Sequence, residues 1–459
     1  MTIMNYLKKK KKLLLLLIIF VLGFYLFSLV GDIIRHGYDK QNKVIELTKS
    51  IISPHYIKKI KNILFIIPQL KAKNQLLELQ IKKYEQGNDG QKFKKQFLEL
   101  GDSKYELNFY FLPFKRLDVN QGWNAKENSL RAHYAEIKNE KIFVISGEGK
   151  IVYFEKKNFL KDKLEFKDLP NNIKDILNEN DLKLIGIRDL YFHNNEVYIS
   201  MIIEDQKGIT INIYKADLNL NKINFEIMFQ TKEYWKKYNV FSGGRIERFD
   251  DENILFATGY AGIEKIAQDT KSLLGKIIKI SVVNGDHEII SIGHRNPQGL
   301  KYIKNKNLII NSEHGPKGGD EINFNILNKG KKIKNYGWDI ASYGTNYDGT
   351  DPFKKSHSNF GFEEPTHYYV PSIGISEIIL LKENSFCRSK CLMISSLRAN
   401  SIYLMNINDK FDELIPNERI FLKGNRIRDI DYDEEFELVI LLTENVPAIV
   451  TMKKIKKID

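Results

Sequence analysis

One short pattern recurs six times along the chain, and it limits the possible folds more than any other feature of the sequence. Each occurrence is an apolar run that ends in Ser or Thr and is soon followed by another strand-like run. The six runs are Ile142–Ser146, Val197–Ser200, Ile254–Thr258, Leu308–Ser312, Leu392–Ser395 and Val439–Thr443. Their closing residues lie 54, 58, 54, 83 and 48 positions apart. This spacing predicts an all-β, six-bladed β-propeller, in which each blade is one small sheet.

Five of the six runs are followed by a partner run that has the composition of a strand. The partners are Lys150–Phe154, Ile209–Tyr214, Lys276–Ile280, Ser401–Ile407 and Ala448–Met452. A pair of β-sandwiches is the alternative, although a sandwich does not require a blade-like period. The longest interval contains residues 317–373, whose glycines and aromatic residues predict long loops rather than extra strands. Long loops on one rim are where a propeller usually carries its function.

The first residues of the chain predict attachment to a membrane. Five lysines, Lys8–Lys12, are followed by the apolar run Leu13–Val30, which extends through Ile34 past one Asp. Such a run is long enough to cross a bilayer as a helix, and the lysines are expected to stay in the cytoplasm. We therefore expect a cytoplasmic tail at 1–12, a single-pass anchor at 13–34 in the cytoplasmic membrane, and a periplasmic or extracellular propeller. A cleaved signal peptide is the alternative, but no A-x-A-like site follows the run.

Residues 35–104 are rich in Lys, Gln, Leu and Ile, and between Gln69 and Tyr84 the apolar residues roughly follow helical spacing. This predicts a helical stalk or linker, with the propeller occupying 105–459. A plain spacer is the simplest role for the stalk.

Charge and cysteine content exclude several classes of protein. The net charge of +13 comes from 71 basic and 58 acidic residues, and no basic stripe with interleaved aromatic residues is present. A lysine-rich solvated surface explains this charge, and nucleic acid is not an expected partner. The chain has only two cysteines, Cys387 and Cys391, which are too few for a zinc site. They are expected either to form a disulfide outside the cytosol or to remain buried thiols.

The stretch from Gly293 to Trp338 is the densest in turn-forming and charged residues. Main-chain carbonyl groups around Gly315 and Pro316, with the carboxylates of Asp320 and Glu321, offer the oxygen ligands that calcium prefers. Arg295 offers a planar fork for a carboxylate. These residues together predict a bound anion beside a metal ion.

Six phrases, in order, resemble the soluble PQQ-dependent glucose and aldose sugar dehydrogenases of the glucose/sorbosone dehydrogenase family. They are Ser242-Gly-Gly-Arg245, Gln268-Asp269 with Leu274-Gly-Lys276, Gly293-His-Arg-Asn-Pro-Gln-Gly299, Glu313-His-Gly-Pro-Lys-Gly-Gly-Asp-Glu-Ile-Asn323, Asn335-Tyr-Gly-Trp338 and Asn425-Arg-Ile-Arg-Asp429. The resemblance covers roughly residue 105 to the end of the chain, and it also implies a six-bladed propeller.

The resemblance implies a site for calcium and for the quinone cofactor PQQ. Calcium would be bound by the main-chain carbonyl groups of Gly315 and Pro316. The residues expected beside the quinone are Arg295, Asn296, His314, Asp320, Arg398, Arg426 and Arg428. Such a cation set suits a tricarboxylate, and calcium would polarise the quinone carbonyl that accepts hydride. In strand geometry a spacing of two also places Arg426 and Arg428 on one face.

The chain departs from the family pattern at the catalytic base. The family has a histidine four residues before the arginine of the Gly-Gly-Arg phrase, and here that position is Phe241. Phenylalanine accepts no proton, and the loss of a general base typically costs a factor of about 10² to 10⁴ in rate. His193 is a candidate substitute, although a histidine beside aromatic residues is more often structural. His294 and His314 match family positions near the site, and either could titrate.

Two further positions differ from the family. Arg398 stands where the family has a lysine, and Ser146-Gly-Glu148 replaces a more polar phrase in the first blade. We expect a PQQ- and calcium-binding protein that oxidises a hydroxyl group of an aldose or a related alcohol and passes electrons to an acceptor. A propeller that has lost catalysis because of Phe241, and acts as a binding or scaffold module, is the alternative.

Overall fold

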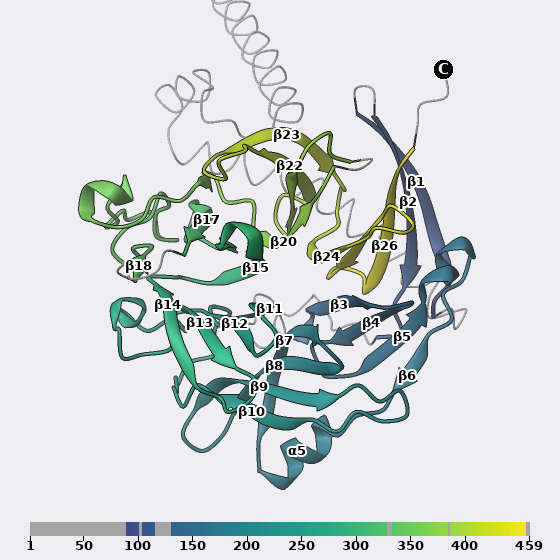
Figure 1. Ribbon diagram of the computed structural model, residues 1–459, viewed down its shortest axis with the longest axis horizontal. Coiled ribbons are helices and arrows are strands. Elements are labelled where there is room, and N and C mark those ends of the chain that lie inside the picture. The colour runs from purple at the N-terminus through teal and green to yellow at the C-terminus, as the bar shows by residue number, and fades with distance from the viewer. Residues whose placement is uncertain (1–88, 101–102, 115–129, 328–332, 384–385, 456–459) are drawn as a thin grey trace, which may run out of the picture. The chain divides into compact units, whose positions relative to one another are not determined.

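The computed structural model describes residues 89–100, 103–114, 130–327, 333–383 and 386–455, and the ribbon forms a ring of six sheets (Figure 1). Within each sheet, strands that follow one another in the blade pair antiparallel. The predicted six-bladed β-propeller is therefore confirmed. A single short α-helix, α5 (Ile173–Glu179), and four 3-10 helices complete the described secondary structure. The latter are η1 (Lys156–Leu160), η2 (Ile266–Gln268), η3 (Lys304–Lys306) and η4 (His357–Phe360).

The first three blades follow one another along the chain. Blade one contains β3 (His133–Lys138), β4 (Lys141–Ser146), β5 (Ile151–Glu155) and β6 (Lys167–Leu169). Blade two contains β7 (Lys183–His193), β8 (Glu196–Glu204), β9 (Ile209–Asp217) and β10 (Glu226–Gln230). Blade three contains β11 (Gly243–Arg248), β12 (Asn253–Thr258), β13 (Lys276–Ser281) and β14 (His287–Ile292), with β18 (Lys334–Asn335) added in parallel at its edge.

The remaining blades complete the ring and close it. Blade four contains β15 (Pro297–Ile303), β16 (Leu308–Glu313), β17 (Asp320–Ile326) and β19 (His367–Tyr369). Blade five contains β20 (Ile375–Leu381), β21 (Cys391–Ser396), β22 (Ser401–Ile407) and β23 (Leu414–Phe421). Blade six combines β24 (Ile427–Asp433), β25 (Leu438–Thr443) and β26 (Ala448–Ile455) with β2 (Ser103–Phe111) and β1 (Lys92–Leu100). Because β2 pairs with β26, strands from both ends of the described chain close the ring.

The recurring apolar runs all have the same place in the fold. Each run lies in the second strand of its blade, and each of the five partner runs lies in the third strand. These strands are buried on both faces, because neighbouring blades pack against them. Six hydrophobic clusters fill the spaces between successive pairs of blades. The apolar runs therefore predict the blades because they form this interblade core.

Two predictions about boundaries were wrong. The predicted stalk, 35–104, overlaps β1 and the first residues of β2, which are strands of blade six. In β1 residues of intermediate exposure largely alternate with exposed ones, as in a strand at the edge of a sheet, so its sequence resembles that of the preceding segment. Residues 317–373 were expected to be loops without extra strands, but they contain β17, β18 and β19. The aromatic side chains of β19 belong to a strand and not to a loop.

The predicted basic tail and anchor, 1–34, and most of the predicted stalk lie outside the described residues. Among the described residues, no helix is long and apolar enough to cross a membrane.

The first strands of the blades line the centre, where one buried guanidinium joins all six. Arg245, on β11, is only 6% exposed. It pairs at 2.9 Å with one carboxylate from each of three other blades, donates to a main-chain carbonyl group of a fourth, and lies over an aromatic ring of the fifth. These partners are Asp189, Glu377, Asp429, the Gln298 carbonyl oxygen and Tyr134. Burial raises the pKa of Glu377 to about 8, although Arg245 opposes this shift.

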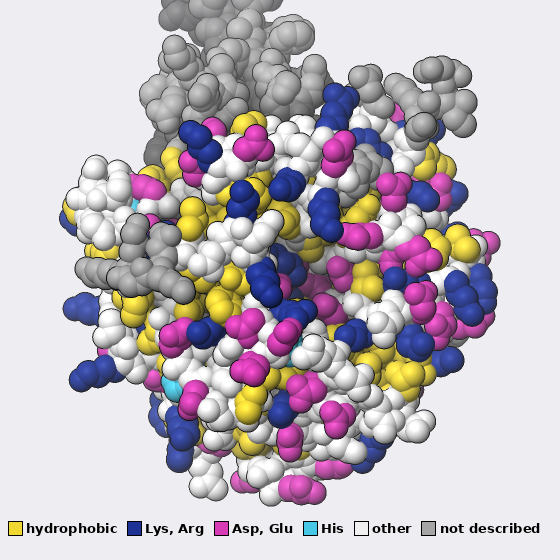
Figure 2. Space-filling model, viewed as in Figure 1, with side chains coloured by type: hydrophobic (Ala, Val, Ile, Leu, Met, Phe, Trp, Pro, Cys, Tyr) yellow, Lys and Arg dark blue, Asp and Glu magenta, His cyan; other side chains and the backbone are white. Residues whose placement is uncertain are grey.

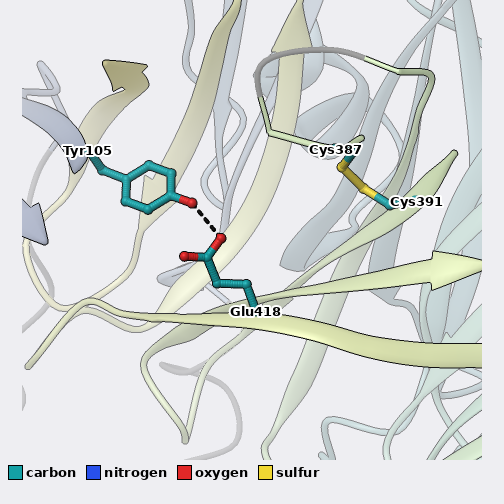
Figure 3. The surroundings of a disulfide bond; sticks show 4 residues. All are labelled: Tyr105, Cys387, Cys391 and Glu418. Carbon is teal, nitrogen blue, oxygen red and sulfur yellow. Dashed lines mark hydrogen bonds between the residues drawn. A yellow bond between two sulfur atoms is a disulfide. The ribbon is translucent and has the colours of Figure 1, made fainter. Parts of the chain in front are cut away.

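Blade five also contains a disulfide between Cys387 and Cys391. Of the two states expected from the sequence, a disulfide or buried thiols, the structure therefore has the disulfide. The nearby Tyr105 hydroxyl, on β2, donates a 2.5 Å hydrogen bond to Glu418 on β23 (Figure 3). Both cysteines and Tyr105 belong to the hydrophobic cluster that joins blades five and six. The disulfide therefore lies beside the seam where the ring closes.

Candidate functional site

Two of the phrases singled out in the sequence pack directly against each other and place Arg295. Between β14 and β15 the chain turns at Gly293, which has a φ of +78°. A Cβ atom at Gly293 would lie 2.2 Å from Asn335 Oδ1 and 2.6 Å from the Gly337 nitrogen, so a side chain has no room there. The Trp338 amide donates to the Gly293 carbonyl group at 3.0 Å. This close approach brings Trp338 beside Arg295.

Arg295 is 4% exposed and is surrounded by aromatic rings. Its Cζ atom lies 4.6 Å from the ring centre of Phe241, 5.0 Å from that of Trp338 and 5.9 Å from that of Tyr260. Its Nη1 donates to the His314 carbonyl group at 3.0 Å. The Nε donor is buried and has no hydrogen-bond partner within the described part of the chain. Because a buried donor without a partner is costly, this atom marks a place for a ligand acceptor.

The Gly315–Asp320 turn is held by the carboxylate of Asp320. One oxygen, Oδ1, accepts from the Gly315 amide at 3.0 Å, and the other, Oδ2, accepts from the Gly374 and Ile375 amides at 2.7 and 3.0 Å. Burial by itself raises the pKa of Asp320, but His314 and these amides outweigh burial and lower it. Asp320 therefore ties the start of this turn to the Gly374–Ile375 segment.

The oxygen atoms available to a metal ion at this turn belong to the main chain. Within the described residues, the Pro316 carbonyl oxygen accepts only a long hydrogen bond, 3.4 Å, from Ser372 Oγ. In the described residues, no group of three or more His, Cys, Asp or Glu side chains is arranged to hold a metal ion. The donor set thus fits a hard cation bound by carbonyl oxygens and by a second ligand that supplies further oxygens.

A buried layer lies beneath this turn. His294 is fully buried, and its ring nitrogens contact Glu313 Oε1 at 2.9 Å and Ser291 Oγ at 2.8 Å. Glu313 also accepts from the Arg295 amide at 2.6 Å, so it supports the loop that carries the arginine. Burial, followed by the charge of Glu313, raises the pKa of Glu321 well above its usual value. Both ring nitrogens of His294 have partners within the protein. Of the two histidines expected near the site, His294 and His314, the first is therefore not available to a substrate.

Arg426 and Arg428 approach one carboxylate from the same face of blade six. Arg428 Nε donates to Glu444 Oε1 at 2.7 Å, and Arg426 Nε donates to Glu444 Oε2 at 3.0 Å. Burial by itself raises the pKa of Glu444, but the two guanidinium groups lower it to about 2. Glu444 therefore remains ionised and orients both arginines, and one negative charge offsets part of their positive charge.

Gln298 links this pair to the loop of Arg295. Its Oε1 accepts from Arg428 Nη1 at 2.7 Å, and its Nε2 donates to Asn296 Oδ1 at 3.2 Å. Asn296 Oδ1 also accepts from the Gly243 amide at 3.1 Å, which ties the loop to β11. Arg428 is thus joined by hydrogen bonds, through Gln298, to Asn296, the residue that follows Arg295. Figure 2 shows basic and acidic side chains around a hollow near the middle of one face of the molecule (Figure 2).

A further guanidinium, Arg188 on β7, was not expected from the sequence. Gly244, with a φ of +123°, lies against it, and a Cβ atom there would be 2.3 Å from Arg188 Cβ. Burial lowers the pKa of Arg188, and the nearby charge of Arg428 acts in the same direction. The Gly-Gly-Arg phrase thus makes room for Arg188 as well as supplying Arg245.

The sequence reasoning also missed Glu444 and the role of Gln298. A signal for Glu444 was present, because a glutamate directly follows the closing Ser or Thr in the fourth and sixth apolar runs, as Glu313 and Glu444. Both glutamates hold an arginine-bearing segment.

Arg398 and His314 lie on the more open side of the turn. Arg398 is exposed and lies next to Gly374, where an added Cβ atom would be 3.0 Å from the Arg398 Cβ. The Gly374 amide in turn donates to Asp320. The side chain of His314 is 20% exposed, and its Nδ1 lies 3.9 Å from Asp320 Oδ1. His314 is therefore the histidine of this site that solvent and a small ligand reach.

Phe241 packs as an aromatic wall. It is half-buried, its ring stacks on Tyr260 with 5.4 Å between ring centres, and its amide donates to Asn239 Oδ1 at 2.9 Å. His193, the candidate substitute base, is 1% exposed at the turn between β7 and β8, and its Nε2 contacts the Asp251 carbonyl group at 2.9 Å. This burial favours a structural role for His193.

Comparison with known proteins gives consistent matches. The family model described as Glucose / Sorbosone dehydrogenase matches residues 133–451. The chain is similar to the aldose sugar dehydrogenase YliI of Escherichia coli K12, with 31% identity over 260 residues that cover 53% of this chain and 68% of YliI.

Two solved structures share the fold. A glucose dehydrogenase superposes with a TM-score of 0.60 at 20% identity, covering 71% of this chain and 97% of that one. The PQQ-bound aldose sugar dehydrogenase of Streptomyces coelicolor superposes with a TM-score of 0.50 at 20% identity, covering 76% and 98%.

Proposed function

The chain belongs to the glucose/sorbosone dehydrogenase family, and from this premise we propose that it binds PQQ and calcium and oxidises a hydroxyl group of an aldose or a related alcohol. The observation that carries the proposal is that Arg295 binds the His314 carbonyl group beside the Gly315–Pro316 turn, while Gln298, three residues further along the same segment, binds Arg428. The buried Nε of Arg295, which has no partner in the described chain, supports an acceptor-bearing ligand at this point.

Each part of the site has a distinct task in this proposal. Arg295 and Asn296 would lie beside the quinone, Arg398, Arg426 and Arg428 would face its acidic groups, and the Gly315 and Pro316 carbonyl groups would bind calcium. When bound, the quinone supplies a two-electron hydride acceptor, and calcium strengthens it as a Lewis acid. Glu444 keeps two arginines oriented before any ligand arrives, which lowers the cost of ordering them.

The substrate must lose a hydride from carbon and a proton from its hydroxyl group. Phe241 takes no proton, so this chain needs another acceptor for it. His314 is the most exposed histidine of the site, and its Nδ1 lies 3.9 Å from Asp320 Oδ1. We propose His314 as the group through which the proton leaves, with lower efficiency than a base placed at position 241.

A second candidate function is favoured by one observation. The Phe241 ring covers one face of the Arg295 guanidinium, where the family places its base. A propeller built in this way would retain ligand binding without turnover and act as a binding or scaffold module.

Reconstitution of the full-length protein in detergent tests both functions. The protein is incubated with PQQ and calcium chloride and dialysed, and the quinone absorbance that remains is measured. Retention is expected for the wild type and for Arg248→Met, an exposed control, and a loss of retention is expected for Arg428→Met. If the wild type retains no quinone, the cofactor proposal fails. If it retains quinone but neither aldoses nor alcohols reduce an artificial electron acceptor, the binding module replaces the dehydrogenase.

We also propose that residues 13–34 anchor the chain in the cytoplasmic membrane, with the propeller on the periplasmic or outer side. The five preceding lysines support this orientation, and the Cys387–Cys391 disulfide suits an oxidising compartment. The expected result is that the full-length chain resists extraction with alkaline carbonate and that protease reaches the propeller from the outer side of spheroplasts. A mature chain that begins after residue 34 and is found in the soluble fraction would contradict the anchor.

A further inference from the structure

A cavity lies at the outer edge of blade two, away from the candidate site at the centre of the ring. It is enclosed by α5 and its following turn, by β8 and β9, and by β10, which lie together in Figure 1. Its volume is about 520 Å³, within the range of about 300–1,000 Å³ that is usual for small-molecule sites. None of its lining residues belongs to the network around Arg295.

The inner wall of this cavity contains polar residues at positions where a strand between two blades normally carries apolar ones. On β9 the inward-facing residues Thr210 and Asn212 are 3% and 2% exposed. The alternate residues of the same strand, Ile209, Ile211 and Ile213, form part of the core with blade three. Two buried polar side chains on one strand face are costly unless they serve an interaction.

These buried groups present acceptors to the cavity. Thr231 Oγ1 donates to the Ile211 carbonyl group, so the 3.2 Å contact between Thr210 and Thr231 uses the hydroxyl hydrogen of Thr210. Burial raises the pKa of Tyr214, and its side-chain interaction with Asn212 opposes this shift. The Asn212 Oδ1 atom is left without a partner in the described chain. A ligand at the inner wall must therefore supply donors.

The rim of the cavity adds negative charge. Asp181, Asp205 and Glu226 line it, against a single basic residue, Lys207. This is a local excess of acid on a chain whose net charge is +13. Such a rim attracts a cation and repels an anion.

The side walls suit an organic cation better than a metal ion. Tyr214, Phe225 and Tyr234 supply aromatic faces, and Ile176 and Ile203 supply aliphatic surface. One lining side chain already makes a contact between an ammonium group and an aromatic ring, because Lys207 Nζ lies 5.6 Å from the ring centre of Tyr234. Ammonium groups interact favourably with aromatic faces, and methylene groups gain from apolar contact.

We propose that this cavity binds a small organic ammonium ion, that is, an aliphatic amine whose nitrogen donates to Asn212 Oδ1 while its chain packs against the apolar walls. An ammonium group has donors and no acceptor, which matches the inner wall. The site is independent of the dehydrogenase proposal.

The test compares 1,4-diaminobutane with its neutral counterpart 1,4-butanediol and with butyrate, using isothermal titration of the full-length protein in detergent. The diamine is expected to bind at least tenfold more tightly than the diol, and butyrate is expected not to bind. Asn212→Leu and Glu226→Gln should each weaken diamine binding severalfold, whereas Glu252→Gln, an exposed carboxylate elsewhere, should not change it. Because Glu226 is exposed, its variant is expected to fold even if the Asn212 variant does not.

Three results would overturn the proposal. These are equal affinity for the diamine and the diol, no detectable binding of the diamine, and diamine binding that Glu226→Gln leaves unchanged. Quinone retention in the same samples reports separately on the central site, so failure at one site is distinguishable from failure at the other.

Discussion

The ring of Phe241 lies over the guanidinium of Arg295, with 4.6 Å between the ring centre and Cζ. The aromatic side chain thus lies against a cation at the position where the family resemblance implies a histidine. This contact stabilises Arg295 by roughly 0.5–2 kcal/mol. The same residue therefore packs against Arg295 and occupies the position where the family resemblance implies a base.

Phe241→His is expected to increase the turnover of aldose oxidation by about 10² to 10⁴, because a general base typically contributes that factor. The measurement is the rate of dye reduction by the PQQ-loaded protein. Phe241→Leu is the control, since it removes the ring without supplying a proton acceptor. If the histidine and leucine variants turn over equally fast, then loss of the base is not what limits this protein.

Arg245→Met is expected to destabilise the propeller by about 3–5 kcal/mol, because it leaves three buried carboxylates without their shared partner. The measurement is the free energy of unfolding from urea titration. Arg248→Met is the matched control on the same strand, since Arg248 pairs with Asp251 at the exposed surface. A similar unfolding midpoint for both variants would show that Arg245 does not hold the blades together.

Glu444→Gln is expected to lower stability at pH 7 by about 3 kcal/mol, because the ionised carboxylate is stabilised in the folded state. The folded-state pKa of about 2 lies below the ordinary value of 4.5, so the unfolded state binds more protons between these values. The difference between wild type and variant should therefore be full above pH 4.5 and shrink as the pH falls towards 2. Urea titrations at several pH values measure it, and a difference that stays constant would contradict this account.

Replacing Cys387 and Cys391 together by serine is expected to destabilise the protein by about 2 kcal/mol, the loop-closure contribution for a sequence separation of 4. The measurement is the urea midpoint with and without reductant. Reductant should shift the midpoint of the wild type and leave that of the double variant unchanged. Insensitivity of both would mean that the two thiols are not joined.

The architecture was predictable because one physical requirement is repeated six times. In each blade the second strand is covered on both faces by neighbouring blades. This strand must therefore be a continuous apolar run, as in Val439–Thr443. The strands β1 and β19 carry no such requirement. They lie at sheet edges and contain residues of intermediate exposure, so their sequences resemble a linker and a loop.

The candidate site was predictable only in part, for a different reason. Arg295 and Arg428 were identified because they stand in recognisable phrases, and the structure joins Arg428 through Gln298 to Asn296, the neighbour of Arg295. Arg428 is held by Glu444, which follows the neighbouring strand of the same blade, and it lies near Arg188 of blade two. Contacts between blades join residues that lie far apart in the chain, so a local motif such as Asn425–Asp429 does not show which residue of another blade lies beside it.

The pairing of β2 with β26 sets an order of events during synthesis of the protein. β2 leaves the ribosome early, and its partner leaves only after the other five blades have been made. In that interval the hydrogen-bonding edge of β2 is open and is able to pair with strands of other chains. A chain truncated before residue 448 would lack β26, so its ring could not close. We expect such a chain to aggregate or to be degraded.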